Sequence, residues 1–323
     1  MKNVYFIILA LALLGCTEID GPVVPRYLEF EEIGDLSEPS LIEGVGMIGS
    51  SDDKHLFIVF RSTSPRTDEL SEKVVRINTT NGEQRVQYNE QADFITKRPQ
   101  IVDGRLVVVG GRHITIYGQN LDDAPEVIRH DRSLTRFGSA VLDNELIVWG
   151  GDLERLHSDK ILVWDWGKNK FNRIGRMPGP KTWAGGAIAR DRLYVFGGQQ
   201  QFQNTWPENQ IYKYNFYTKE SETFFLPDST KRTYSASQGH LIYVAGQIID
   251  RDVFTLDLDI LFGVFDTRTD QYFPVLTNLS SDQLWTIHQM CIVGEYVYIL
   301  YGNEFRSSYD VKIMRARLPP LDD

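Results

Sequence analysis

Short runs of apolar residues, separated by polar turns, follow one another along most of the chain, and several of them end in glycine. Three runs end in a glycine pair and three others fit the same frame without the complete pair: "RLVVVGG" at Gly110–Gly111, "ELIVWGG" at Gly150–Gly151, "RLYVFGG" at Gly197–Gly198, and "HLFIVFR", "LIYVAG" and "YVYILYG". Runs of this length that are rich in Val, Ile, Tyr and Phe predict β-strands. Because they recur at intervals of roughly 40 to 56 residues, they predict a repeated unit.

Further strands surround each of these glycine-ended strands. After it come a variable loop and two strands joined by a polar turn, as at Asn81–Gly82 and at residues 267–270, which is the hairpin signal. Before it comes a shorter run of small and apolar residues, such as "GSAVLDNE" or "GGAIARDR", whose modest side chains suit a crowded inner position. No amphipathic helical period of useful length appears after residue 20. We therefore predict an all-β protein built from six four-stranded antiparallel units.

The third unit resembles a kelch repeat. It has a strand ending in two glycines, an aromatic residue with an aspartate, an aromatic residue after a polar turn, and Met-Pro-x-Pro with a base: Gly150–Gly151, Trp164, Asp165, Phe171, Met177, Pro178, Pro180 and Lys181. The resemblance covers most of the chain and is strongest between Arg136 and Pro227. It implies a six-bladed kelch-type β-propeller of the galactose oxidase and kelch superfamily. A WD-type repeat is the alternative, but the Trp164–Asp165 pair occurs once, without a preceding Gly-His pair.

A kelch-type ring also needs its last blade to be completed. The last unit, which starts near Leu284, lacks an outer strand. Conversely, "RYLEFEEIG" at residues 26–34 precedes the first unit and has no partner within it. We therefore predict that a strand around Tyr27 to Ile33 completes the last blade and closes the ring, which removes an exposed sheet edge.

The first residues resemble a bacterial lipoprotein signal. Lys2 precedes an apolar run from Val4 to Leu14, which is shorter than the about 20 residues of a membrane-spanning helix and fits a secretory signal. The ending "LLGC" is similar to a lipobox and implies acylation of Cys16; a cleaved signal with an incidental cysteine is the alternative. We expect three segments: a signal peptide at 1–15, a lipid-anchored tether at 16–25 and the propeller at 26–323.

Acidic residues follow the expected lipidation site. Glu18 and Asp20 resemble the signal that sends lipoproteins of Bacteroidetes-type bacteria to the cell surface, and an ordinary polar tether is the alternative. We therefore expect a lipid anchor in the membrane of the bacterial cell envelope, at the outer membrane, on either its periplasmic or its surface face.

Charge and cysteine content exclude two classes. The net charge is −10 and no basic run is longer than two residues, which argues against nucleic acid as a partner because phosphate neutralisation needs clustered Lys and Arg. Cys16 and Cys291 are the only cysteines. Because Cys16 is assigned to lipid, an intramolecular disulfide framework is excluded.

Basic and aromatic residues recur just before the predicted inner strands. A propeller would gather them at the mouth of its central channel: Arg98, Arg136, Lys181, Trp183, Arg232, Tyr234 and Trp285. A guanidinium group holds a carboxylate through two parallel hydrogen bonds, and an aromatic ring contacts the flat apolar face of a sugar. These residues are therefore the candidate ligand-binding set. The alternative is that the bases pair with a neighbouring blade as structural struts.

The sequence offers little for metal or cofactor chemistry. The six histidines fall in different units without a repeated ligand spacing, so we expect neither a metal nor a cofactor. The acidic stretch "DRDVFTLDLD" alternates acids with apolar residues and lacks the glycine turn of a calcium loop. Cys291 is expected to be a small core residue, which also argues against a copper-radical oxidase like galactose oxidase.

Two classes of function remain. The first, which we favour, is a non-catalytic recognition module that binds a glycan or a protein partner through the long loops on one face of the propeller. The second is an enzyme that resembles the kelch-type sialic acid mutarotases, which act on an anionic sugar. It would need a basic clamp for the carboxylate and one acid-base group, for which Glu154, Glu208 and Asp250 are the candidates.

Overall fold

The computed structural model describes residues 24–36, 45–91, 97–153, 156–199, 207–249, 258–280, 285–303 and 311–321. Every regular element in these ranges is a β-strand, so the prediction of an all-β protein is confirmed. Within the described part of the chain, no helix is long and apolar enough to cross a membrane. Cys16 and the predicted signal peptide lie outside the described residues.

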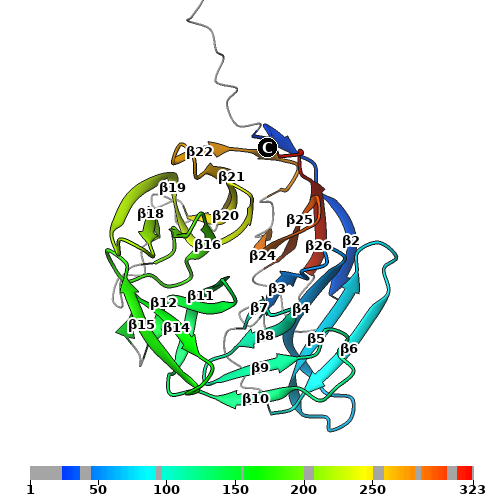
Figure 1. Cartoon of the computed structure of the whole chain (residues 1–323). Coiled ribbons are helices and arrows are strands. Elements are labelled where there is room, and N and C mark those ends of the chain that lie inside the picture. Colours follow the sequence, from blue (N-terminus) through cyan, green and yellow to red (C-terminus); the bar gives the residue numbers. More distant parts are fainter. Residues whose placement is uncertain are drawn as a thin grey trace, which may run out of the picture.

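The strands form antiparallel meanders that follow one another along the chain (Figure 1). The first meander contains β3 (Gly46–Gly49), β4 (His55–Thr63), β5 (Leu70–Asn78) and β6 (Gln84–Asn89). The second contains β7 (Arg98–Val102), β8 (Arg105–Val109), β9 (His113–Tyr117) and β10 (Glu126–Arg129). The third contains β11 (Leu134–Leu142), β12 (Glu145–Leu153), β14 (Lys160–Asp165) and β15 (Lys170–Arg176), with β13 (Leu156–His157) beside β12.

The next two meanders share one sheet. Its strands are β16 (Gly185–Ala189), β17 (Arg192–Phe196), β18 (Glu208–Asn215), β19 (Ser221–Gln238), β20 (Leu241–Ile249), β21 (Leu258–Asp266) and β22 (Gln271–Pro274). The last meander contains β24 (Trp285–Val293), β25 (Tyr296–Asn303), β26 (Val311–Arg317) and, from the start of the chain, β2 (Glu31–Leu36). A separate parallel pair joins β1 (Tyr27–Leu28) to β23 (Leu276–Thr277).

Strand β19 departs from the predicted separation of units. It runs for 18 residues, and its first half pairs with β18 while its second half pairs with β20. Thr230 pairs with both neighbours, opposite Glu208 on one side and Ile248 on the other. The segment contains no glycine at which the chain could turn sharply. The strand therefore continues from the outer position of one meander to the inner position of the next.

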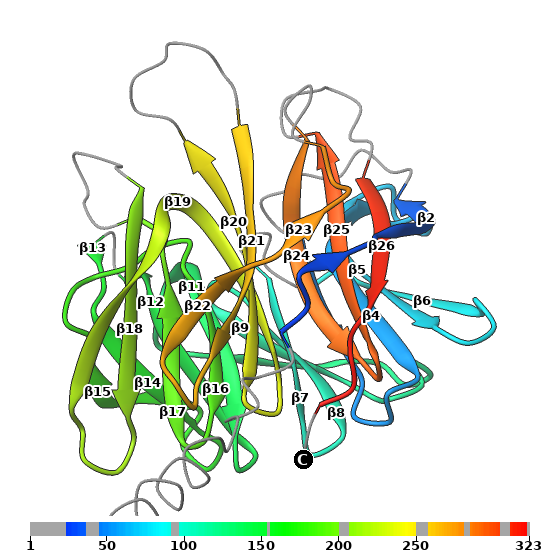
Figure 2. The same ribbon diagram turned by 90° about the horizontal axis from the view of Figure 1, so that it is seen from above.

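The sheets are arranged around a common centre (Figures 1 and 2). The first strand of each meander is innermost, and these strands contact one another in chain order: β3, β7, β11, β16, β19 and β24. Strand β24 also contacts β3, so the last meander lies beside the first. Side chains from the innermost strands of every meander therefore meet at the centre of the molecule.

Hydrophobic clusters fill the spaces between successive meanders. One cluster packs Trp149 of the third meander with Tyr212 of the next, and another packs Val59 with Val108 of the second. A further cluster joins Ile58 of the first meander to Leu300 of the last. Cys291 is 3% exposed in that same cluster, so the prediction that it is a core residue is confirmed. Apolar burial thus links the two ends of the chain, which supplies much of the driving force for folding.

Two of the predicted glycine pairs have the backbone conformation that glycine favours. Gly150 and Gly151 have φ angles of +62° and +74°, and Gly197 and Gly198 have +53° and +83°. A Cβ atom on Gly150 would lie 2.4 Å from the carbonyl oxygen of Lys181. Positive φ and close backbone approach both exclude a larger residue here, so these pairs hold the end of one strand against the start of the next meander.

The N-terminal segment pairs with two strands near the end of the chain, β23 and β26. Strand β2 pairs antiparallel with β26, from Glu31 opposite Arg315 to Leu36 opposite Val311. The predicted pairing of an N-terminal strand with the last meander is thus confirmed, but its bounds are shifted from the expected Tyr27 to Ile33. Tyr27 and Leu28 instead form the short parallel pair with β23. The reason is that Phe30, 3% exposed, turns into the core between these two sheets.

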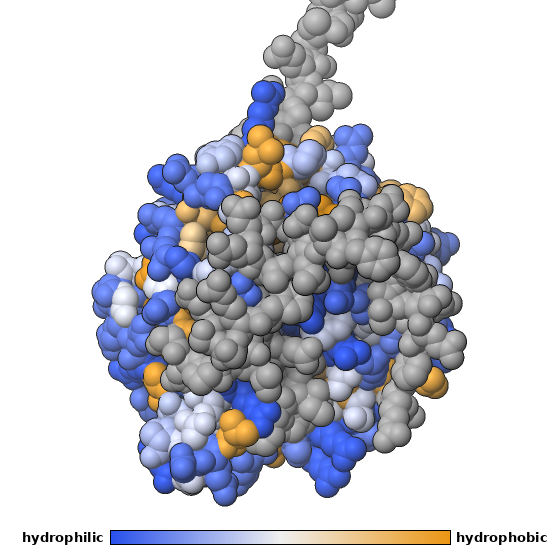
Figure 3. All heavy atoms as spheres, turned by 180° about the vertical axis from the view of Figure 1, so that it is seen from behind, coloured by the Kyte–Doolittle hydropathy of each residue, from blue (hydrophilic) through white to orange (hydrophobic). Residues whose placement is uncertain are grey.

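The described part of the outer surface is mainly hydrophilic. Figure 3 shows apolar residues scattered among hydrophilic ones on the face opposite to that of Figure 1. The most exposed large apolar side chains among the described residues, Tyr217 between β18 and β19 and Leu276 on β23, are 77% and 72% exposed and lie far apart in the sequence. Single exposed apolar residues are ordinary on protein surfaces.

Candidate functional site

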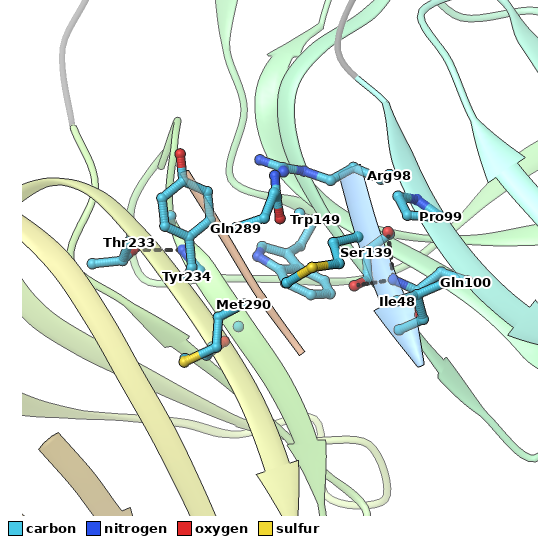
Figure 4. Close-up of a pocket in the computed structure, with 16 residues that line it drawn as sticks. Ile48, Arg98, Pro99, Gln100, Ser139, Trp149, Thr233, Tyr234, Gln289 and Met290 are labelled. Atoms are coloured by element: carbon cyan, nitrogen blue, oxygen red, sulfur yellow. Dashed lines mark hydrogen bonds between the residues drawn. The ribbon is translucent and has the colours of Figure 1, made fainter. Parts of the chain in front are cut away.

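The innermost strands enclose a cavity at the centre of the molecule (Figure 4). One chamber of about 80 Å³ is lined by polar side chains from several meanders: Arg98, Gln100, Ser139, Tyr234 and Gln289. Trp149 and Met290 are among its apolar walls. A second chamber of about 300 Å³ shares Gln100 and Ser139 with the first. A cavity that receives side chains from every meander is the natural binding site of such an arrangement.

Arg98 and Tyr234, two residues of the predicted set, line the smaller chamber. Arg98 begins β7, and its Nε donates a hydrogen bond to the carbonyl oxygen of Phe137, 2.8 Å away. Burial lowers the pKa of the Arg98 guanidinium below its ordinary value, and Tyr234 opposes part of that shift. Desolvation of a cation has this effect because the charged form loses hydration. The structure therefore places a partly buried positive charge in the lining of the small chamber.

Three more predicted residues, Arg136, Trp183 and Arg232, form a second group next to this cavity. The guanidinium carbon of Arg136 lies 5.5 Å from the Trp183 ring centroid, and that of Arg232 lies 4.6 Å from it. Both distances are within the range of cation–π attraction. We call these three residues the arginine–tryptophan cluster. Trp183 is only 9% exposed, so its ring holds the two guanidinium groups rather than offering an open face to a sugar.

Backbone hydrogen bonds fix the arginine–tryptophan cluster across three meanders. The Trp183 amide donates to the Arg136 carbonyl at 2.9 Å, and the Thr233 amide donates to the Trp183 carbonyl at 3.0 Å. Arg136 and Trp183 both have φ of 57°, in the left-handed region that residues other than glycine seldom adopt. Such conformations cost about 1 to 3 kcal/mol and persist only where the surroundings enforce them. The cluster is therefore a rigid, preformed arrangement.

The cluster borders the small chamber. Gly138, Ala184 and Thr233 line that chamber, and each follows a member of the cluster by one or two residues. The side chain of Arg136 is 46% exposed, so this end of the cavity presents positive charge to solvent. The structure thus brings five residues of the predicted set to the small chamber or to the arginine–tryptophan cluster beside it.

Lys181 and Trp285 do not join this group. Lys181 is 1% exposed, and its Nζ lies 3.6 Å from Glu208 Oε2 and 4.7 Å from the centroid of the Tyr212 ring. Burial lowers the pKa of Lys181 to about 8, although Glu208 opposes the shift. Trp285 packs against Tyr301, with ring centroids 5.1 Å apart, and lines neither chamber. Both side chains are part of the packing between strands.

Lys97 takes the same structural role one residue before Arg98. It is 3% exposed, and its Nζ lies 2.6 Å from Glu72 Oε2 on β5 of the preceding meander. Tyr117 of β9 donates its hydroxyl to the other oxygen of Glu72 at 2.5 Å. The alternative that these bases are struts between units therefore describes Lys97 and Lys181, whereas Arg98 lines the small chamber and Arg136 and Arg232 contact the Trp183 ring beside it.

Sequence reasoning missed two groups near the site. Asp152 Oδ2 lies 3.7 Å from Arg136 Nη1, and Asp152 Oδ1 lies 3.3 Å from His157 Nε2. Gln289 reaches the chamber through a register shift in β24 between Ile287 and Gln289, which the alternation of residues does not reveal. The nearness of Asp152 and His157 in the sequence, on either side of a predicted loop, was the one available signal for the first pair.

Comparison with known proteins adds nothing to these observations. No model of a known protein family matches the chain, and no curated protein is similar to it in sequence. The functional assignment therefore depends on the residues and geometry described above.

Metal ligands and acid-base residues are the groups that catalysis at this site would need. In the described ranges, no group of three or more His, Cys, Asp and Glu residues could hold a metal ion. Of the three acids considered for acid-base chemistry, Glu208 is the partner of Lys181. Glu154 and Asp250 lie outside the described residues. What the geometry supports is the binding of a negatively charged group by fixed guanidinium groups.

Proposed function

We propose that this chain is a six-bladed kelch-type β-propeller that acts as a lipid-anchored recognition module of the bacterial cell envelope. Its ligand is an anionic carbohydrate, bound at the end of the central cavity beside the arginine–tryptophan cluster. The module is non-catalytic, and its lipid anchor is the acylated Cys16. The single observation that carries the ligand class is the grouping of three arginines from three meanders: Arg98 lines the small chamber, and Arg136 and Arg232 lie on the Trp183 ring beside it.

The arrangement of the meanders supports the propeller. Innermost strands contact one another in chain order, and a hydrophobic cluster joins the last meander to the first. The N-terminal strand β2 supplies the outer strand of the last meander, which is a common way to close a propeller and to protect a sheet edge. Under this proposal β19 serves two neighbouring blades.

The chemistry of the cavity end supports an anionic ligand. Guanidinium groups bind carboxylates in bidentate geometry and are more weakly hydrated than ammonium groups, which suits them to sites of this kind. The cluster contains two of them on one indole ring, and the Asp152 carboxylate lies 3.7 Å from Arg136. A ligand carboxylate beside the cluster would therefore meet two guanidinium groups.

Loss of the two cluster arginines tests this function. We expect the double variant Arg136→Ala, Arg232→Ala to lose at least tenfold in affinity for the anionic oligosaccharides that wild type selects on a glycan array, because charged hydrogen bonds contribute about 1.5 to 3 kcal/mol each. Arg173→Ala is the matched control, since Arg173 is an exposed arginine on β15.

Two results would contradict the proposal. Normal glycan binding by a double variant that unfolds more easily would make both arginines structural. Interconversion of sugar anomers by the wild-type protein, measured with acidic sugars by nuclear magnetic resonance, would make the chain an enzyme rather than a recognition module.

A further inference from the structure

Arg98 occupies a different position from the other bases of the site. Its side chain reaches into the small chamber, and Figure 4 shows its guanidinium end directed toward Gln289 and Tyr234 across the cavity. The hydrogen bond from Nε to the Phe137 carbonyl, at 2.8 Å, fixes the plane of the guanidinium group. Its terminal amino groups are therefore presented to the chamber in one orientation.

The described lining of the chamber offers no acidic counter-ion for this charge. Among the residues that the structure describes, no aspartate or glutamate lines the chamber or forms an ion pair with Arg98. The neighbouring Lys97 is different, because Glu72 lies 2.6 Å from its ammonium group. Arg98 is partly buried, and a positive charge that is partly withdrawn from water and lacks an acidic partner is costly in free energy. A cavity that retains one is suited to an anion supplied by a ligand.

The other polar groups of the chamber are held by the protein itself. Gln100 donates through Nε2 to the carbonyl and hydroxyl oxygens of Ser139, both at 3.0 Å. Gln289 donates through Nε2 to the Val45 carbonyl at 2.8 Å. With these side chains fixed and Trp149 buried as a wall, the chamber is preorganised, which lowers the entropic cost of binding.

The volume of the chamber limits what enters it. A water molecule accounts for about 30 Å³ of liquid, and the chamber measures about 80 Å³. It accommodates a carboxylate group and is small for a sugar ring. Among the described residues that line the larger chamber, none is charged. Charge recognition is therefore confined to the end where Arg98 and the arginine–tryptophan cluster lie.

We infer that Arg98 binds a terminal carboxylate of the ligand inside the small chamber. The ligand is then a sugar that carries this carboxylate at one end, and its carboxylate enters the chamber first. This inference rests on the proposed function and narrows its ligand class. The sugar body stays outside the chamber, next to Arg136 and Arg232, and the acid group supplies the missing counter-ion.

Binding measurements with matched acid and amide sugars test the inference. The probes are glucuronate, galacturonate and N-acetylneuraminate, each paired with its neutral carboxamide, titrated by calorimetry into the intact protein. We expect wild type to prefer at least one acid over its amide by tenfold or more, as the loss of charged hydrogen bonds implies. Arg98→Gln should abolish that preference. Arg98→Lys should keep part of it, because lysine retains the positive charge but lacks the two parallel hydrogen-bond donors of a guanidinium group.

The controls separate this inference from the proposed function. Arg173→Gln should leave the preference unchanged. A wild type that prefers none of the three acids, or an Arg98→Gln variant that keeps the preference, overturns the inference. If binding depends on Arg136 and Arg232 but not on Arg98, the proposed function stands and the inference fails. If the acid preference depends on Arg98 alone, the inference stands and the role of the cluster fails.

Discussion

At the scale of single residues, the basic side chains just before the inner strands lie in two different environments: beside a carboxylate or in the central chamber. Lys97 and Lys181 are buried, and each lies near a carboxylate, Glu72 or Glu208. Arg98 lies in the central chamber, where the described lining contains no acid. The two kinds of side chain also respond differently to burial, because a guanidinium group keeps its proton under desolvation whereas an ammonium group loses its proton more readily. Burial accordingly lowers the pKa of Lys181 to about 8.

The pH dependence of stability tests the burial of Lys181. Because its pKa falls from 10.5 to about 8 on folding, the unfolded chain binds the proton more tightly, and stability rises as the pH increases through this window. We expect wild type to gain on the order of 2 to 3 kcal/mol relative to Lys181→Met between about pH 7 and pH 10. Denaturant unfolding of both proteins across this range measures the difference, and a constant difference would contradict the assignment.

At the scale of elements, β2 connects the two ends of the chain. It pairs along β26, and Arg315 Nε and Lys312 Nζ lie 2.6 Å from Glu31 and Glu32 of β2. These ion pairs are exposed and contribute little by themselves. The principal contribution of β2 is therefore its backbone pairing, which covers the edge of β26, together with the packing of Phe30 just before it.

Removal of β2 tests this role. A chain that begins at Val45 should melt at a lower temperature than wild type and should self-associate, because the edge of β26 becomes available for pairing with another chain. A chain that begins at Val24 is the matched control and should melt like wild type, since it retains every described strand. Equal melting temperatures for the two truncated chains, measured by circular dichroism with light scattering, would show that β2 does not stabilise the last meander.

At the scale of the whole molecule, the fold and the anchor act together in the proposed function. The described residues form one arrangement of sheets around the binding cavity, and β1 begins at Tyr27, directly after the expected tether at 16–25. A tether of that kind would hold the cavity near the membrane surface while leaving the domain free to rotate. This role requires lipid on Cys16, which lies outside the described residues.

Replacement of Cys16 tests the proposed lipid anchor. Cys16→Ser should move the protein from the membrane fraction to the soluble fraction or leave an uncleaved precursor, because a lipobox without cysteine cannot be acylated. Its sugar binding should match that of wild type, because the cavity residues are unchanged. Fractionation followed by immunoblotting measures the change, and a variant that stays in the membrane fraction with a processed N-terminus refutes the lipid anchor.

Local patterns in the sequence determined the strands, two of the glycine pairs and the pairing of the N-terminal strand. Alternating and apolar runs predict strands because residues two apart share one face of a sheet, and the all-β prediction follows from those runs. Gly150–Gly151 and Gly197–Gly198 are likewise predictable, since glycine is the residue that adopts a positive φ without a Cβ clash. The pairing of an N-terminal strand with the last meander follows from one strand lacking a partner at each end of the chain.

Only the tertiary structure decided which bases face the cavity. Lys97 and Arg98 are adjacent in sequence, yet one is paired with Glu72 on the preceding meander and the other opens into the chamber. The register shift that brings Gln289 to the centre and the continuation of β19 through two meanders also have no local signature. The physical reason is that these features depend on contacts between residues from different meanders, often about 40 positions apart in a repeat of this kind. Each residue type allows either environment, and the packing of neighbouring sheets selects one.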